Sequence, residues 1–523
     1  MYCTKGFMNI YHYFTHITCI SCLSFLKGET SLARPLEAKL DHLKKTLGHL
    51  PDVVFKKMNV GQTGIHVIMI YLSGIADTSM INEQIVKPLI LTGVRENHSP
   101  VNPEKIKEEL IQQTAFTIDM TEGTDLETCV SKVLSGYTCL LIEGTDDVFF
   151  ASTGKFPSRS VDEPSTETLV RGPREGFIED LESNLAMVRR HIKDISFRID
   201  KITIGRRSSR KLAILYISDI ANPELVQEVK RRVETIDVDD ASDTGVIEQW
   251  IEEHPWSPFP QIQASERSDK AITALMSGRV VIMLDGTPFV LIAPMTFWML
   301  AQSPEDYYER FPLGTFFRML RLMALFIATF LPSLYVALIS FHPGLIPPEL
   351  VISIVASREG IPFPVFVEAL IMEVALEILR EASLRLPKGI GQVIGIVGGL
   401  VIGQAAVEAA VVSAFLIIVV GLTAIASFAS PQYSGSIGIR LLRFPIMMIA
   451  GVYGLYGVIL AFICLGVHMV QIKSFGVPYM SPLAPVRLRD QQDTLVRVPF
   501  KYLRKRPMML KTQDETHSNR KRK

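Results

Sequence analysis

The 523-residue sequence has few cysteines and lacks the signatures of common enzymes. Its six cysteines are too sparse for a disulfide framework, and none shows the paired spacing of a zinc site. It contains no nucleophile elbow, no zinc-protease motif and no cluster of Cys and His, so nothing argues for catalysis. The formal net charge is zero. We therefore expect a protein that is not an enzyme, with no cofactor, no metal and no nucleic-acid partner.

Charge is almost missing from one long apolar stretch, residues 389–430, where Glu408 is the only formally charged side chain. At about 1.5 Å per helical residue this stretch would reach roughly 60 Å, twice the roughly 30 Å hydrocarbon core of a bilayer. We therefore expect it to cross a membrane, turn near residues 408–410 and cross again. Glycine recurs at every fourth position in its first half, which favours close packing of another helix, unless composition alone explains it. These glycines are Gly391, Gly395, Gly399 and Gly403.

An internal repeat organises the part of the chain before residue 295. The segment IMIYLSGIADTSMINEQI (68–85) aligns with AILYISDIANPELVQEV (213–229), and each reads strand, turn, helix. LSGYTCLLIEGTDDVFF (134–150) aligns with MSGRVVIMLDGTPFVLI (276–292), and each reads as a hairpin. We expect a soluble α/β (α+β) domain of two similar subdomains, whose cleft is either a ligand site or a scaffold for assembly.

The second half of the sequence predicts a polytopic α-helical membrane domain. Residues 322–341 form a first clear span, and the arginines before it place the soluble domain in the cytoplasm. A last clear span lies within residues 441–470. The tail after it, residues 473–523, carries thirteen Lys and Arg against four Asp and Glu, which favours a cytoplasmic end.

Residues 351–387 are apolar but interrupted by prolines and carboxylates, so they cannot be an ordinary lipid-facing span. The broken-helix motif consists of Pro362, Phe363, Pro364 and Glu368. On a helix Glu373 and Glu377 share one side, and a ring of subunits would place them as two rows of carboxylates along a cation pore. The alternative is that both glutamates pair with Arg380 or with an arginine of a partner subunit and serve only assembly.

The arginines do not fit a simple count of spans. Four spans leave Arg380, Arg385, Arg440 and Arg443 outside the cell, whereas a fifth span at 362–380 brings them inside and sends the basic tail out. We expect residues 350–386 to be re-entrant or interfacial. The predicted domains are an unassigned extension (1–34), two soluble subdomains (35–160 and 161–305), a helical transmembrane domain (306–472) and a basic tail (473–523).

Several segments resemble the A subunit of the spore germinant receptors, the GerA family. They include RGPREGFIEDLESNLAMVRRHIK, SPFPQIQASERSDK, DGTPFVLIAP, SREGIPFPVFVEAL, LREASLRLP and LLRFPIMMIAGVYGLYG. The resemblance implies a multi-pass protein of the spore inner membrane with a cytoplasmic N-terminal domain. It also implies a polytopic, nutrient-binding B subunit and a lipoprotein C subunit as partners, and homo-oligomerisation into a ligand-gated ion channel that signals germination.

The sequence departs from the family pattern at a few positions. Ala410 and Ala414 stand where Gly and Pro are expected around the central turn, and Ser383 and Ser268 stand where Gly and Pro are expected elsewhere. Loss of helix breakers would make that turn more helical. The alternative function is a secondary transporter or flippase-like protein. Its hallmark would be a repeat within the membrane half, whereas the repeat lies in the soluble half.

Overall fold

The computed structural model describes residues 36–60, 63–95, 119–123, 125–154, 163–164, 166–386, 398–399 and 401–517. The predicted extension 1–34 therefore lies outside the described residues. The chain divides into two compact units, Met1–Arg159 with Glu182–Ile199, and Ser160–Leu181 with Asp200–Lys523. We describe each by itself.

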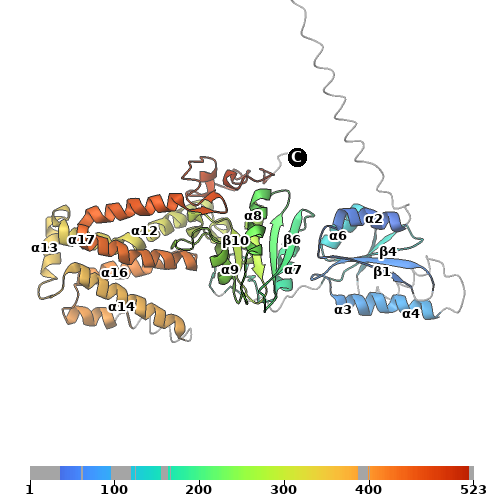
Figure 1. Cartoon of the computed structure of the whole chain (residues 1–523), viewed down its shortest axis with the longest axis horizontal. Coiled ribbons are helices and arrows are strands. Elements are labelled where there is room, and N and C mark those ends of the chain that lie inside the picture. Colours follow the sequence, from blue (N-terminus) through green and yellow to red (C-terminus); the bar gives the residue numbers. More distant parts are fainter. Residues whose placement is uncertain are drawn as a thin grey trace, which may run out of the picture. The chain divides into compact units, whose positions relative to one another are not determined.

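The first unit is built on an antiparallel sheet with strand order β1-β2-β4-β5-β3. Period-two alternation explains its two-sided core, because Ile68 and Ile70 of β2 face one cluster while Val67 and Met69 face the other. In Figure 1, α2 and α6 lie on one side of the sheet and α3 and α4 on the other. The elements are α2 (Leu36–Leu47), β1 (Val53–Asn59), β2 (His66–Leu72), α3 (Thr78–Ile81), the π-helical turn η1 (Asn82–Val86), α4 (Lys87–Arg95), β3 (Met120–Gly123), α6 (Leu126–Leu134), β4 (Thr138–Ile142), β5 (Val148–Ala151) and α7 (Leu181–His191).

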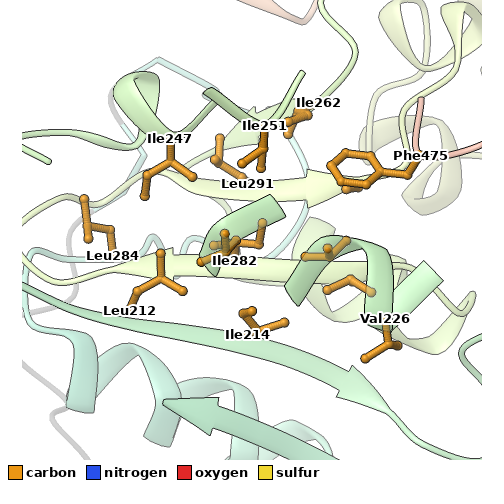
Figure 2. Packing of buried hydrophobic residues seen from close by; sticks show 14 of the residues in the cluster. Leu212, Ile214, Val226, Ile247, Ile251, Ile262, Ile282, Leu284, Leu291 and Phe475 are labelled. Atoms are coloured by element: carbon orange, nitrogen blue, oxygen red, sulfur yellow. The ribbon is translucent and has the colours of Figure 1, made fainter. Parts of the chain in front are cut away.

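A second sheet has the corresponding order, β6-β7-β9-β10-β8. Helices α8 and α9 cover one of its faces. Figure 2 shows Val226 of α8 and Ile247 of α9 in the same apolar cluster as Ile214 and Ile282 of the strands. The elements are β6 (Phe197–Ile204), β7 (Arg210–Ile217), α8 (Pro223–Glu234), α9 (Thr244–Ile251), β8 (Gln263–Ser265), α10 (Ser268–Met276), β9 (Val280–Leu284), β10 (Val290–Ala293), η2 (Phe297–Leu300) and α11 (Glu305–Tyr308).

The structure confirms the repeat predicted from the sequence. Strand β2 leads into α3 as β7 leads into α8, and the aligned residues Asp77 and Asn222 cap the two helices by accepting backbone N–H bonds. The hairpins β4–β5 and β9–β10 turn at Gly144 and Gly286, whose φ angles of 86° and 91° are in the left-handed region that glycine adopts most easily. Two copies of one chain path therefore underlie the two sheets.

The helical region that follows is packed around one apolar cluster, which includes Val336, Ala369, Leu416 and Met447. Its long first helix, α12 (Phe311–Phe341), contains the predicted first span. The other elements are η3 (Pro343–Leu345), α13 (Pro348–Ala356), α14 (Val365–Arg385), a helical stretch over residues 401–408, α16 (Ala414–Ser427) and α17 (Tyr433–Gln471).

Helix α17 contains a break that the sequence did not predict. Its backbone leaves the helical region at Gly454 (φ 60°, ψ −143°), which separates two arms, 433–453 and 455–471. Leu442 of the first arm and Leu465 of the second pack against the same cluster around Phe259. The arms are therefore antiparallel neighbours, so the segment predicted as one span within 441–470 is divided into two helices at Gly454. The sequence around Gly454 is continuously apolar and contains several glycines, so its pattern does not indicate which glycine lies at the reversal.

The turn predicted near residues 408–410 is confirmed, because helix 401–408 ends there and α16 begins at Ala414. Ala410 occupies the turn with φ 52°, the left-handed conformation that the expected glycine would adopt at little cost. Ala414 stands at the first helical position, where proline is well tolerated. The turn has thus kept its geometry without the two helix breakers.

After α17 the chain returns to the second sheet. Phe475, between the short strands β11 (Lys473–Ser474) and β12 (Val477–Pro478), is buried in the core that Figure 2 shows. Further on, the Gln513 amide donates to the carbonyls of Ser218 and Ala221 at 3.1 and 3.0 Å. Two 3-10 turns, η4 (Asp490–Asp493) and η5 (Met508–Leu510), lie in this segment. The described part of the basic tail is therefore folded against the α/β part of its own unit.

Candidate functional site

Acidic residues of α14 and arginines of α17 form an ion-pair ladder in the helical region. Glu373 pairs with Arg443, and both side chains are almost fully buried, at 1% and 3% exposed. One helical turn away, Glu377 lies 3.4 Å from Arg440 and 3.3 Å from Arg380. The deeper glutamate pairs with the later arginine, which is the register of two antiparallel helices. The ladder therefore joins α14 to the first arm of α17.

The break before α14 holds a second buried carboxylate. Pro364 is the N-cap residue of α14, and proline disfavours helix in the residue before it, so the chain bends at the predicted motif. Glu368, fully buried, pairs with Arg358 at 2.8 Å and accepts the backbone N–H of Ser413 at 3.1 Å. The Tyr335 hydroxyl lies 3.1 Å from the Ser413 hydroxyl. One carboxylate thus ties the α13–α14 connection to the turn that starts α16.

The other predicted residues are dispersed. Pro362 and Phe363 lie in the same connection, where Phe363 is 38% exposed. Gly391 and Gly395 fall outside the described residues. A Cβ on Gly399 would meet nothing within 4 Å, and a Cβ on Gly403 would be in ordinary contact with Ile417 at 3.5 Å. A closer approach occurs at Gly398, where a Cβ would lie 2.8 Å from Leu379 of α14. The predicted glycine face therefore stays a prediction.

A third charged network lies where the α/β part meets α12. Arg318 is fully buried and reaches Asp306 and Asp493, each at 3.3 Å, while Arg321 reaches Asp306 at 2.7 Å. The Tyr307 hydroxyl donates to Asp493 at 2.7 Å, and burial followed by the Asp493 charge raises the pKa of that hydroxyl. This network fixes the C-terminal segment to the start of α12. Among the described residues, no group of three or more His, Cys, Asp or Glu could hold a metal ion.

The sequence offered pairing of the two ladder glutamates with Arg380 or with an arginine of a partner subunit as one alternative, but it did not identify Arg440 and Arg443 of the same chain as partners. Spacing carried the missing signal. Glu373 and Glu377 are four residues apart, and Arg440 and Arg443 are three apart, so each pair lies on one face of its helix. Because charges in apolar helices need partners, two such faces of opposite sign were candidates to meet.

The fold and these contacts define a class of protein in which a duplicated α/β module carries an apolar helical bundle with buried ion pairs. The chain belongs to the GerA family, because the model of the Bacillus/Clostridium GerA spore germination protein matches residues 41–509. It is similar to spore germination protein KA of Bacillus subtilis, at 40% identity over 94% of this chain and 90% of that protein. The uncharacterized membrane protein YfkQ of Bacillus subtilis is 38% identical over 90% of both chains.

A solved structure also matches part of the chain. It is the crystal structure of the N-terminal domain of the A subunit of the Bacillus megaterium spore germinant receptor GerK3, at 29% identity. The match covers 51% of this chain and 97% of that chain, with a TM-score of 0.40.

Proposed function

We propose that this chain is the A subunit of a nutrient germinant receptor, embedded in the spore inner membrane, and that several copies assemble into a ligand-gated ion channel. Membership of the GerA family supports the role in spore germination. The observation that carries membrane embedding is the inverted polarity of the helical region. Glu373 and Arg443 pair inside it, whereas Ile418, Ile425 and Val452 are more than 60% exposed on its surface. Helix α12 and the α17 segment Gly435–Gln471, which is broken at Gly454, are long and apolar enough to cross a bilayer.

The helical hairpin of α17 supports a topology in which the arginines and the basic tail lie on one side. In the proposed topology α12 leaves the side of the α/β part, α14 returns to it, and the two arms of α17 leave and return again. The hairpin formed by 401–408 and α16 enters and leaves from that same side. Arg380, Arg440 and the basic tail then all lie on the side of the second sheet, as the positive-inside rule expects for the cytoplasm.

The proposed conducting path retains Glu373 and Glu377 as its acidic candidates. Within one chain Glu373 faces Arg443, while the Glu377 side chain is 41% exposed. Carboxylate rows repeated around a ring of subunits favour cations. The competing role for both is assembly through the ladder. The proposed partners are a polytopic B subunit that binds the nutrient and a lipoprotein C subunit.

Charge reversal separates the two roles. We expect Glu377→Lys to lower nutrient-triggered cation release from spores and to shift the ion preference of the reconstituted complex away from cations, with the receptor still accumulating. Glu381→Lys is the matched control, because Glu381 lies on the same helix, 60% exposed and paired with Arg385. Unchanged selectivity in Glu377→Lys complexes would contradict the pore assignment. A purified complex that supports germination but is monomeric and carries only coupled, non-conductive transport would favour the transporter alternative.

A further inference from the structure

A cavity of about 150 Å³, with arginine and serine side chains on its wall, opens at the end of the helical region nearest the second sheet. It lies between the ends of α14 and α16 and the start of α17, and the hydroxyl of Ser430 on its wall donates to the Leu300 carbonyl. The volume is several times what a single water molecule needs. The side chains that matter for its chemistry are Arg380, Arg440, Ser427, Ser436 and Phe428.

Positive charge is in excess around this cavity. The guanidinium groups of Arg380, Arg440 and Arg443 face the two carboxylates of the ladder, so one positive charge has no counterpart within it. Arg440 is only 9% exposed, and its Nε–H has no hydrogen-bond partner among the described residues. A buried guanidinium with an unmade bond is costly, which points to an anion that completes the site.

The shape of the donors selects the kind of anion. Guanidinium groups present planar forks of N–H donors that match phosphate oxygens, and two of them converge here from different helices. Arg380 also donates to the Ser427 hydroxyl at 2.9 Å, which fixes its direction. Its guanidinium stacks 4.7 Å from the centre of the Phe428 ring. That ring is 73% exposed and gives the mouth of the cavity an apolar rim.

We propose that this cavity binds a phosphate group and that the headgroup of an anionic phospholipid supplies it. The phosphate site follows from the arginines and the cavity. The choice of lipid as its source rests on the proposed membrane location, since a headgroup phosphate at that surface would meet the arginines while its acyl chains lie along the exposed apolar helices. The lipid would then hold α14, α16 and α17 together at the surface next to the second sheet.

The test measures the thermal midpoint of the purified full-length chain in mixed micelles. Micelles with phosphatidylglycerol are expected to raise the midpoint by about 2–4 °C over micelles with phosphatidylcholine, because a ligand that binds only the folded state stabilises it. Inorganic phosphate is titrated separately. A rise with inorganic phosphate alone would support the phosphate site and assign it to the soluble anion. No rise with either would overturn the proposal.

Three variants localise the effect. Arg440→Gln should remove the phosphatidylglycerol increment, and Arg385→Gln should keep it, because Arg385 is 78% exposed and paired with Glu381 outside the cavity. If Arg440→Gln does not fold, Ser436→Asp supplies a carboxylate at the cavity wall. It should raise the midpoint in phosphatidylcholine and abolish the increment. An increment of equal size in Ser436→Asp and the unmodified chain would overturn the site. The thermal midpoint reports binding and does not depend on ion flux. A failure of the channel proposal would therefore not change the result expected here.

Discussion

The backbone conformation of Ala410 lowers the stability of the turn before α16. A φ of 52° is unfavourable by about 1 kcal/mol for a residue with a Cβ, whereas glycine, which has no Cβ, adopts it without that strain. We expect Ala410→Gly to raise the free energy of unfolding by about 1 kcal/mol, measured by thermal or denaturant unfolding of the purified chain. Ala409→Gly is the control. Ala409 ends the preceding helix with an ordinary φ and should lose stability instead. Destabilisation by both would show that the strain at Ala410 is not relieved.

The pair Glu373–Arg443 is an almost fully buried ion pair between α14 and α17. Glu373→Gln leaves a buried guanidinium without its counter-charge, and we expect a loss of about 3–5 kcal/mol or failure to accumulate. The double variant Glu373→Met, Arg443→Met should recover most of the loss, because it removes both buried charges. Glu381→Gln, in the exposed pair with Arg385, should cost less than about 1 kcal/mol. Equal losses of stability in Glu373→Gln and Glu381→Gln would contradict a special structural role for the buried pair.

At the scale of one element, helix α9 places carboxyl groups close together. Burial, followed by the charges of Glu252 and Asp243, raises the pKa of Glu248 from 4.5 to about 8. A carboxyl whose pKa is higher in the folded state stabilises the fold while protonated, and this contribution is lost as the pH rises through about 8. We expect the stability advantage of Glu248→Gln over the unmodified chain to grow between about pH 5 and 8 and then level off.

Chemical denaturation across that pH range checks the expectation for α9. Glu234→Gln, at an exposed position near the end of the neighbouring helix α8, is the surface control and should not reproduce the pH-dependent difference. A constant difference between Glu248→Gln and the unmodified chain at every pH would show that Glu248 does not titrate in this window.

Two kinds of element were predictable from the sequence: those that repeat along the chain, and the turn required by the length of the apolar stretch 389–430. The strand–turn–helix copies follow from local patterns, so aligning residues 68–85 with 213–229 and residues 134–150 with 276–292 predicted two similar subdomains. The turn at residues 408–410 followed from comparing 42 apolar residues (389–430) with the thickness of a bilayer. Neither inference needed contacts between distant residues.

Features built from distant contacts were not predictable in the same way. The α14–α17 ladder joins residues 63 to 70 positions apart (440 − 377 and 443 − 373), and the spacing of charges only suggested faces that could meet. The reversal at Gly454 could not be predicted, because the apolar sequence on both sides of it has the pattern of one span. The composition of the tail predicted a basic cytoplasmic end but not its packing, because Phe475 is buried against a sheet whose last strand ends more than 180 residues earlier (475 − 293).

At the scale of the whole molecule, the contact between the tail and the second sheet would restrict the topology of the helical region in the proposed membrane. Gln513 donates to the carbonyl of Ser218, although α12, α14 and α17 intervene along the chain. Such a contact can exist in a membrane only if both segments lie on the same side. An odd number of crossings between residues 311 and 471 is therefore excluded for any form of the protein in which the contact is present.

Cross-linking in membranes tests this sidedness. In a variant without native cysteines, Ser218→Cys with Gln513→Cys should be joined efficiently by a short bismaleimide. The reason is that the side-chain amide of Gln513 donates to the backbone carbonyl of Ser218. Ser218→Cys with Gly344→Cys is the negative control, because Gly344 lies in η3 beyond the far end of α12. An impermeant thiol reagent should then label positions 218 and 513 from one side and position 344 from the other. Labelling of 513 and 344 from the same side, without cross-linking to 218, would mean that α17 crosses only once and that the tail does not return to the sheet.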